Sequence, residues 1–262
     1  RYLGRINESL TVTQKSVQLT PQDAEAHNNL GLTLKELGRL DEAEASYRQA
    51  IALKSDYAEA HYNFANTLKE LGRLDEAEAS FRQAIALKSD YAKAHNNLGA
   101  TLQKLGRLDE SADSLKRSIE LKSDFIEAHH NLSVTLQKLG RLDESIECLK
   151  KVIELNPELV EARMSLNTVA SSAVPVWHLS MMNDVVRNRA YSDAIKLAVG
   201  DTDLVLDIGT GSGLLSMMAA ASGAEKVIAC ESSKTIAQIA TEIIDINGYA
   251  GKVSVLNKKS TD

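Results

Sequence analysis

Cysteine is scarce in this sequence, with two residues, Cys148 and Cys230, in a chain of 262. The two lie far apart and form no C-x-x-C pair, which excludes a disulfide framework and a cysteine-ligated zinc site. We therefore expect no metal site. Such sparing use of cysteine suits a reducing compartment, so the cytoplasm or the nucleus is the expected location.

Positive charge and long apolar runs are lacking as well. The formal net charge is −6 and the isoelectric point is about 5.6, which argues against a nucleic-acid-binding surface. No apolar run approaches the roughly 20 residues needed to cross a bilayer, and no signal peptide is visible. We expect neither nucleic acid nor a membrane among the partners. The chain starts at Arg1 and stops at Asp262 without a terminal cap, as expected of a piece of a longer protein.

The sequence is rich in self-similarity. The 34 residues "AEAHNNLGLTLKELGRLDEAEASYRQAIALKSDY" recur in near copies, each with two amphipathic helical patterns joined at a glycine. One helix pair cannot bury its apolar stripe alone, so neighbouring pairs are expected to stack around a continuous core. Full repeats are expected at 24–57, 58–91, 92–125 and 126–159, with turns at Gly38, Gly72, Gly106 and Gly140.

The period of 34 and the residue pattern resemble the tetratricopeptide repeat. The first full repeat keeps parts of that family's pattern, such as Leu30 and Gly31, while the closing proline is present only as Pro157. The chain begins inside an earlier repeat, and 160–173 supplies one more first helix as a cap. The resemblance implies an α-solenoid over residues 1–173.

One histidine also recurs in each repeat, which raises the question of a metal site. At one residue per helix pair, these side chains are too far apart to share one ion. We interpret the position as a packing site that an aromatic residue usually fills. The four residues are His27, His61, His95 and His129.

An asparagine also recurs in each repeat, on the first helix of the pair, and first helices line the inner surface of such solenoids. A ladder of side-chain amides can donate to and accept from an extended peptide backbone, so we expect a peptide groove here. The repeats, with "AHNNLG", resemble those of the O-linked N-acetylglucosamine transferase. The alternative is that the amides are merely solvated, or were inherited when a repeat was duplicated. The ladder consists of Asn29, Asn63, Asn97 and Asn131.

Residues 174–262 lose the 34-residue period. "SMMNDVVRNRAYSDAIKLAV" (180–199) predicts a helix, and "DLVLDI", "KVIACE" and "KVSVL" predict strands with helices between them. Strands that alternate with helices indicate a parallel sheet with right-handed crossovers. The expected fold is therefore an α-solenoid followed by an α/β domain with an incomplete Rossmann-like sheet.

The stretch "VLDIGTGSGLLSMMA" places a glycine-rich turn at the carboxyl end of the first strand, where such sheets bind ligands. Dinucleotide sites use G-x-G-x-x-G, but Leu214 stands where that pattern needs its third glycine. The carboxylate of Asp207 disfavours a pyrophosphate and favours a ligand with an amino group, namely S-adenosylmethionine. Glu231, at the tip of the next strand, has no expected core role and is placed to accept from ribose hydroxyls. The alternatives are that the turn binds a dinucleotide and that its glycines are needed only for packing.

Upstream of this turn, "WHLSMMNDVVRNRAY" resembles a segment of the protein arginine methyltransferases. "VIACE" and "VLNKKSTD" follow in that family's order and spacing, so the resemblance covers nearly all of residues 174–262. The branch that it resembles carries tetratricopeptide repeats before the catalytic domain. The resemblance implies the N-terminal part of a class I methyltransferase domain, with S-adenosylmethionine as cofactor.

The resemblance also implies roles for single residues. Arg187 would pair with the carboxylate of the cofactor, and Met181 would help to wall the channel for the substrate guanidinium. The alternatives are an exposed helix cation for Arg187 and a core residue for Met181. The implied cofactor-binding residues are His178, Arg187, Asp207, Gly209, Gly211, Glu231, Ser260 and Thr261.

As a whole, the resemblance implies a protein arginine N-methyltransferase whose repeats recruit the protein substrate. The family's pair of catalytic glutamates would lie beyond the third strand, so no catalytic residue is assigned and this stretch alone is expected to be inactive. "SSAVPV" stands where many members of the family have paired tyrosines. An acidic residue that is common in the family near Thr261 is replaced here by a hydroxyl residue. The alternatives are an interaction scaffold with a non-catalytic remnant and a methyltransferase for another acceptor.

Overall fold

The computed structural model describes residues 2–173 and 181–259. The chain forms two compact units, residues 1–141 with 148–162, and residues 142–147 with 163–262. The division falls within the helices Leu142–Leu155 and Val160–Ala173. The expected domain boundary at residue 173 stays a prediction.

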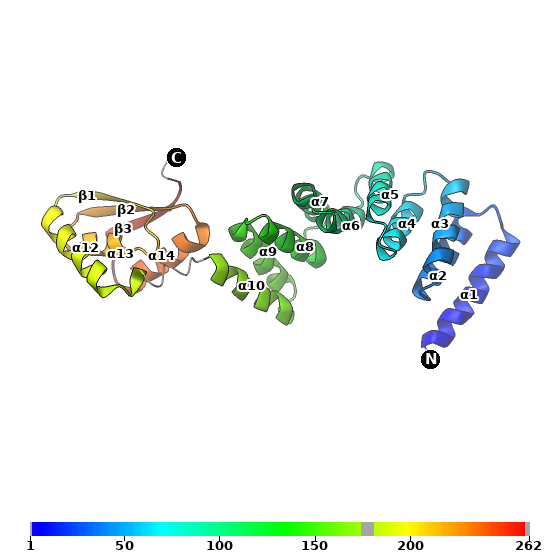
Figure 1. Cartoon of the computed structure of the whole chain (residues 1–262), viewed down its shortest axis with the longest axis horizontal. Helices are drawn as coiled ribbons and strands as arrows, with labels where there is room; N and C mark the ends of the chain where they lie inside the picture. Colours follow the sequence, from blue (N-terminus) through cyan, green and yellow to red (C-terminus); the bar gives the residue numbers. More distant parts are fainter. Residues whose placement is uncertain (1, 174–180, 260–262) are drawn as a thin grey trace. The chain divides into compact units, whose positions relative to one another are not determined.

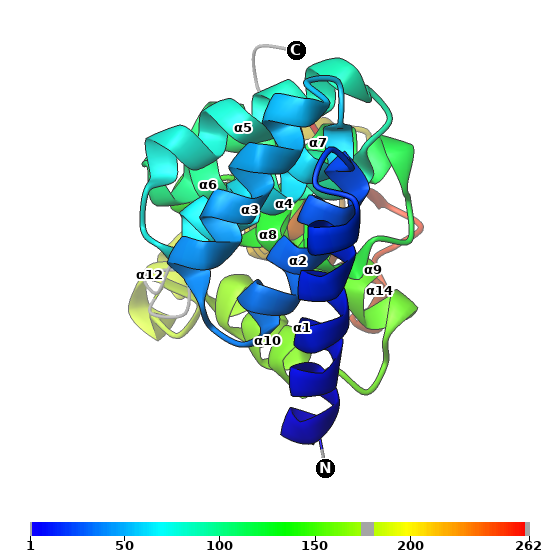
Figure 2. The same cartoon turned by 90° about the vertical axis from the view of Figure 1, so that its right-hand side faces the viewer.

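The first unit is a row of antiparallel helix pairs (Figure 1), and Figure 2 looks along this row from the end at α1. From α1 to α8, each helix packs on the next one along the chain. The four expected repeats are present with the expected helix pairs, so the predicted α-solenoid is confirmed. The helices are α1 (Tyr2–Leu19), α2 (Ala24–Glu36), α3 (Leu40–Leu53), α4 (Ala58–Glu70), α5 (Leu74–Leu87), α6 (Ala92–Lys104), α7 (Leu108–Leu121), α8 (Ile126–Lys138), α9 (Leu142–Leu155) and α10 (Val160–Ala173).

A glycine in the left-handed region ends the first helix of each pair. Gly38 has φ +74°, and the next residue, Arg39, donates its backbone N–H to the carbonyl of Leu34 at 2.9 Å. Only glycine adopts this conformation without steric cost, and the bond satisfies one of the last helical carbonyls. The same geometry recurs at the three later turns, Gly72, Gly106 and Gly140.

The core of the repeats is built from one large side chain in each second helix. These residues are fully buried, and the first helix opposite carries a small residue at each level. A Cβ atom on Gly31 would come within 2.6 Å of Tyr47, and one on Gly99 within 2.5 Å of Leu115. The small residues therefore allow the two helices to approach closely. The large residues are Tyr47, Phe81, Leu115 and Leu149.

Ion pairs join the second helices α3 and α5 to the repeat that follows each of them. Arg73 donates from Nη1 to Oε2 of Glu44 at 2.7 Å, and Arg107 does the same to Glu78 at 2.7 Å. Burial acts to raise the pKa of Glu44, but hydrogen bonds from Arg48 and Arg73 prevail and lower that pKa. The stabilisation is therefore present above the ordinary glutamate pKa and is lost as the pH falls through the lowered value.

We expect the substitution Tyr47→Phe to raise the free energy of unfolding by about 1 kcal/mol, because the Tyr47 hydroxyl is buried and has no hydrogen-bond partner. Phe81 fills the same position in the next repeat. Urea unfolding followed by circular dichroism measures the change. Tyr62→Phe is the matched control and is expected to destabilise, because the Tyr62 hydroxyl accepts from Asn97 at 3.1 Å. A loss of stability in Tyr47→Phe would contradict the prediction.

The second unit contains a three-stranded parallel sheet in the order β1-β2-β3, which confirms the predicted α/β fold. In the register, Val205 lies beside Val227, and Val227 beside Val253. The elements are α12 (Val185–Ala198), β1 (Leu204–Ile208), α13 (Leu214–Ala221), β2 (Lys226–Glu231), α14 (Lys234–Ile246) and β3 (Val253–Asn257).

The helices of this unit cover one face of the sheet (Figure 1). Val227, Ala229 and Val253 are buried on this face, in one cluster with residues of α13 and α14. On the opposite face, the β1 side chains of Leu204 and Leu206 are 74% and 61% exposed. Among the described residues, the sheet thus has one packed face and one apolar face in solvent.

The structure corrects the predicted helix over 180–199. Met181 and Met182 lie in a short helical turn, and α12 begins at Val185. Asp184 causes the break, because its Oδ1 accepts from the backbone N–H of Arg187 at 2.9 Å and so caps a new helix. The cap places Arg187 in the first turn of α12.

Candidate functional site

The glycine-rich turn lies between β1 and α13, at the carboxyl ends of β1 and β2. Gly209 and Thr210 donate their backbone N–H groups to the carbonyl of Cys230, at 2.8 and 3.0 Å. Gly209, Gly211 and Gly213 all have positive φ, at +74°, +57° and +80°. The turn therefore requires its three glycines and is held against the end of β2.

Asp207 ends β1 directly below this turn. Its Oδ2 accepts from the hydroxyl of Thr210 at 2.8 Å and from that of Ser216 at 2.6 Å. Charge-assisted hydrogen bonds of this kind hold a carboxylate in one orientation. Sequence reasoning identified Asp207 but missed both hydroxyl residues, whose signal is their position inside and just after the glycine pattern.

Glu231, at the end of β2, is buried and has a structural role that the sequence does not predict. Its Oε2 accepts from the backbone N–H of Gly211 at 3.2 Å, and its Oε1 from that of Ser233 at 3.0 Å. The carboxylate thus ties the glycine turn to the start of α14. An ionised carboxylate has about four acceptor positions, so these bonds leave capacity for a ligand hydroxyl.

A small hollow of about 90 Å³ lies beside the turn. Arg187 and Met181 line it together with Gly209 and Gly211, so the structure brings these four predicted residues together. Met182, Thr210, Ser212, Leu214 and Leu215 complete the lining. The volume is smaller than the roughly 300 Å³ of a typical ligand pocket, so the hollow accounts for one end of a ligand only.

Arg187 is half-buried, and its guanidinium is only partly satisfied. Nη2 donates to Oδ1 of Asn188 at 3.2 Å, and the group lies 5.6 Å from the ring centroid of Tyr191. The Nε atom is buried and has no hydrogen-bond partner. A buried donor without a partner is costly, and it indicates a missing acceptor at this point of the hollow.

Three predicted cofactor-binding residues, His178, Ser260 and Thr261, lie outside the described residues. Their part in the site stays a prediction. Among the described residues, no group of three or more histidine, cysteine, aspartate or glutamate side chains is arranged to hold a metal ion.

The recurring asparagines lie on the first helices and bond to the preceding repeat. Asn63 donates from Nδ2 to Oδ1 of Asn28 at 3.0 Å, and Asn131 donates to Asn96 at 3.0 Å. Asn97 donates to Asn66 at 2.8 Å and to the hydroxyl of Tyr62 at 3.1 Å. Asn63 and Asn131 thus each use one donor, and Asn97 uses two, to join neighbouring repeats, and only the remaining groups can contact a peptide. Asn29 is exposed.

The recurring histidines have a local role. Nε2 of His27 lies 3.0 Å from the carbonyl oxygen of Pro21, and that of His61 lies 3.0 Å from that of Ser55. His95 and His129 make the same contact at 3.3 and 2.9 Å. The position therefore fastens each first helix to the turn before it.

Comparison with protein families matches both parts of the chain. The description "TPR repeat" matches residues 1–38, 33–72 and 65–106, and "Tetratricopeptide repeat" matches residues 90–158. "Ribosomal protein L11 methyltransferase" matches residues 193–262. The last match includes the glycine turn, Asp207 and Glu231.

Curated relatives are methyltransferases that act on arginine. An arginine N(omega)-methyltransferase of Streptomyces achromogenes subsp. streptozoticus is 42% identical over 93 residues, which are 36% of this chain and 26% of the relative. Protein arginine N-methyltransferase 9 of Xenopus laevis is 45% identical over 95 residues, 36% of this chain and 12% of the relative. Protein arginine N-methyltransferase 7 of Gallus gallus is 44% identical over 91 residues, which are 32% of this chain and 13% of the relative. The match thus spans about a quarter or less of each of these relatives.

Solved structures match the repeats. MamA superposes with a TM-score of 0.56 at 24% identity and covers 62% of this chain and 94% of that one, a likeness of fold alone. YrrB, described as a TPR protein with an unusual peptide-binding site, has a TM-score of 0.55 at 25% identity and covers 61% and 82%.

A search of the described helices for one both long and apolar enough to span a bilayer found none. The repeat pattern, the parallel sheet with its glycine turn and the matches to known families agree with one another. The chain therefore consists of tetratricopeptide repeats followed by a methyltransferase-like α/β unit, and its curated relatives include an arginine N(omega)-methyltransferase and protein arginine N-methyltransferases.

Proposed function

We propose that this chain is part of an S-adenosylmethionine-dependent protein arginine N-methyltransferase, in which the repeats recruit the protein substrate. The observation that carries the proposal is the buried, unpartnered Nε of Arg187 in the hollow beside the glycine turn. A guanidinium matches a carboxylate with two parallel hydrogen bonds, and S-adenosylmethionine carries one carboxylate.

The other residues of the site fit the same ligand. Gly209 and Gly211 leave room for close approach by a ligand, and Asp207 holds a negative charge below the turn. Glu231 would accept from ribose hydroxyls with its remaining lone pairs. When bound, the cofactor supplies an activated methyl group, and this chain's residues would bind and orient it.

Transfer to arginine also needs carboxylates that aim one guanidinium nitrogen at that methyl group. No acidic side chain lines the described hollow. For residues 1–262 we therefore propose cofactor binding and substrate recruitment, without turnover by this stretch alone. A scaffold with a degenerate remnant is the second candidate, but the hydrogen bonds that hold Asp207 in place favour a functional site.

Isothermal titration calorimetry of residues 1–262 with S-adenosylmethionine tests the proposal. We expect binding by the unsubstituted chain, and a loss of affinity of about tenfold or more in Arg187→Ala, because the carboxylate loses a charged hydrogen-bond partner. Arg189→Ala is the matched control on the same helix and is expected to bind normally, since Arg189 is exposed and does not line the hollow.

Two outcomes would contradict the proposal. Absence of binding by the unsubstituted chain would favour the scaffold, and preferential binding of NAD would favour a dinucleotide site.

Neither cysteine forms a disulfide, and we further propose that the protein works in the cytoplasm or the nucleus.

A further inference from the structure

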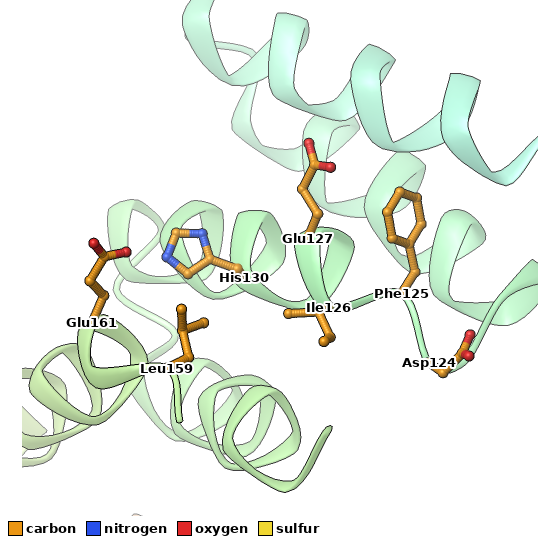
Figure 3. Close-up of a pocket in the computed structure, with 7 residues that line it drawn as sticks. All are labelled: Asp124, Phe125, Ile126, Glu127, His130, Leu159 and Glu161. Atoms are coloured by element: carbon orange, nitrogen blue, oxygen red, sulfur yellow. The ribbon is translucent and has the colours of Figure 1, made fainter. Parts of the chain in front are cut away.

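An opening outside the candidate cofactor site lies in the repeat unit. It is a hollow of about 500 Å³ at the start of α8, beside the turn between α9 and α10 (Figure 3). Ile126 and Leu159 face each other across its apolar part, and the side chains of Glu127, His130 and Glu161 stand above them. Asp124 and Phe125 complete the lining, which contains no lysine or arginine.

The same place in earlier repeats contains a cation from the chain itself. Lys88 lies 3.5 Å from Glu59 and 5.0 Å from the ring centroid of Tyr91. Lys54 and Lys122 lie over Tyr57 and Phe125 in the same way, at 5.1 and 5.5 Å. A lysine thus recurs at this level with the 34-residue period.

The period is broken at the hollow. Asn156 stands where the next lysine would fall, and Leu159 stands where the next aromatic ring would fall. By register, Glu127 corresponds to Glu59, and Asn156 to its partner Lys88. Glu127 therefore lacks the periodic lysine that its counterpart Glu59 has, although it accepts from Asn96 at 3.1 Å and its charge acts on Lys69.

A second interaction that is present in the preceding repeat is absent at the hollow. In the preceding repeat, Asn96 donates from Nδ2 to Oε1 of Glu127 at 3.1 Å. The equivalent pair one repeat later is His130 and Glu161, and these two side chains form no hydrogen bond with each other in the described part of the chain. Glu161 thus lines the hollow, and in the described part of the chain its carboxylate forms no ion pair.

We propose that this hollow docks a partner polypeptide through a lysine or arginine side chain followed by an apolar residue. The cation would take the place of the missing lysine beside Glu127, Glu161 would add negative charge on the other side of His130, and the apolar side chain would pack on Ile126 and Leu159. The lining carries three carboxylates and His130, while Lys122 lies over the ring of Phe125. The excess of acidic charge selects a basic segment. This docking rests on the proposed recruiting role of the repeats. It does not involve the cofactor, so calorimetry with S-adenosylmethionine tests the methyltransferase assignment separately.

Fluorescence anisotropy with residues 1–262 tests the proposal. The probe is a labelled nine-residue peptide in which arginine–leucine pairs alternate with glycine, and a second probe has glutamate in place of each arginine. We expect the basic peptide to bind and the acidic peptide not to bind. The double substitution Glu127→Gln and Glu161→Gln is expected to weaken binding of the basic peptide at least fivefold.

The most discriminating variant restores the lysine that the 34-residue period predicts at position 156. Asn156→Lys gives Glu127 a cation of its own and is expected to weaken peptide binding at least fivefold, while Asn156→Gln, the neutral control, leaves it unchanged. Folding is not at risk from a lysine at a position where three earlier repeats carry one, and circular dichroism checks it. Equal affinity in Asn156→Lys and the unsubstituted chain, or equal binding of both peptides, would overturn the proposal.

Discussion

Replacement of Phe81 by alanine is expected to lower the free energy of unfolding of the repeats around it by about 4 kcal/mol. The ring is fully buried and lies 5.9 Å from the ring of Tyr62, between centroids. Its removal leaves a cavity in a core that neighbouring repeats share. Urea-dependent hydrogen exchange, read on peptides from α4, α5 and α6, measures the local loss.

Phe81→Leu is the matched control for this substitution. The next repeat has a leucine at the equivalent position, Leu115, which is also fully buried. We expect a loss of about 1 kcal/mol, because the volume is largely kept. If alanine and leucine cost the same, the ring would not be the element that holds adjacent repeats together.

Gly213→Ala is expected to destabilise the α/β unit by about 3 kcal/mol. The residue has φ +80°, which costs an L-amino acid about 1–2 kcal/mol. The new Cβ would also lie 2.8 Å from Cδ1 of Ile244, which is itself buried on α14. Relief of that contact requires the closely packed side chain of Ile244 to move, at a further cost of about 1 kcal/mol or more.

Gly248→Ala separates these two contributions. Gly248 has nearly the same φ, +78°, but a Cβ there would meet nothing within 4 Å. We expect it to lose only the conformational part, about 1–2 kcal/mol. Hydrogen exchange of β1, β2 and β3 in the full chain compares the two variants. Equal losses would show that contact with Ile244 carries no penalty.

The repeats are predictable from sequence because their elements depend on local signals that recur four times. A glycine at Gly38 and its counterparts ends each first helix, and small residues such as Gly31 face large ones such as Tyr47. The hydrogen bonds between repeats are not predictable in this way. Asn63 bonds to Asn28, a residue 35 positions earlier, and that offset depends on how successive helix pairs stack.

The candidate site is predictable in its position but not in its bonding. The glycine turn marks the end of β1, and it indicates Asp207 and Glu231 without any structure. The bonds of Glu231 to Gly211 and Ser233 depend on the backbone dihedral angles of the turn, which the sequence does not reveal. Similarly, the helical pattern runs through Asp184, and only the structure shows that this side chain caps a new helix.

The ion pairs between repeats have a consequence for how such a chain can grow. Arg73 reaches back to Glu44, and Arg107 reaches back to Glu78, so one 34-residue unit contains both halves of its own interface. Duplication of the unit therefore creates a matching contact without any new residue. An array of this kind can gain or lose a member by recombination and remain self-complementary, and new specificity then requires only a local departure from the copy.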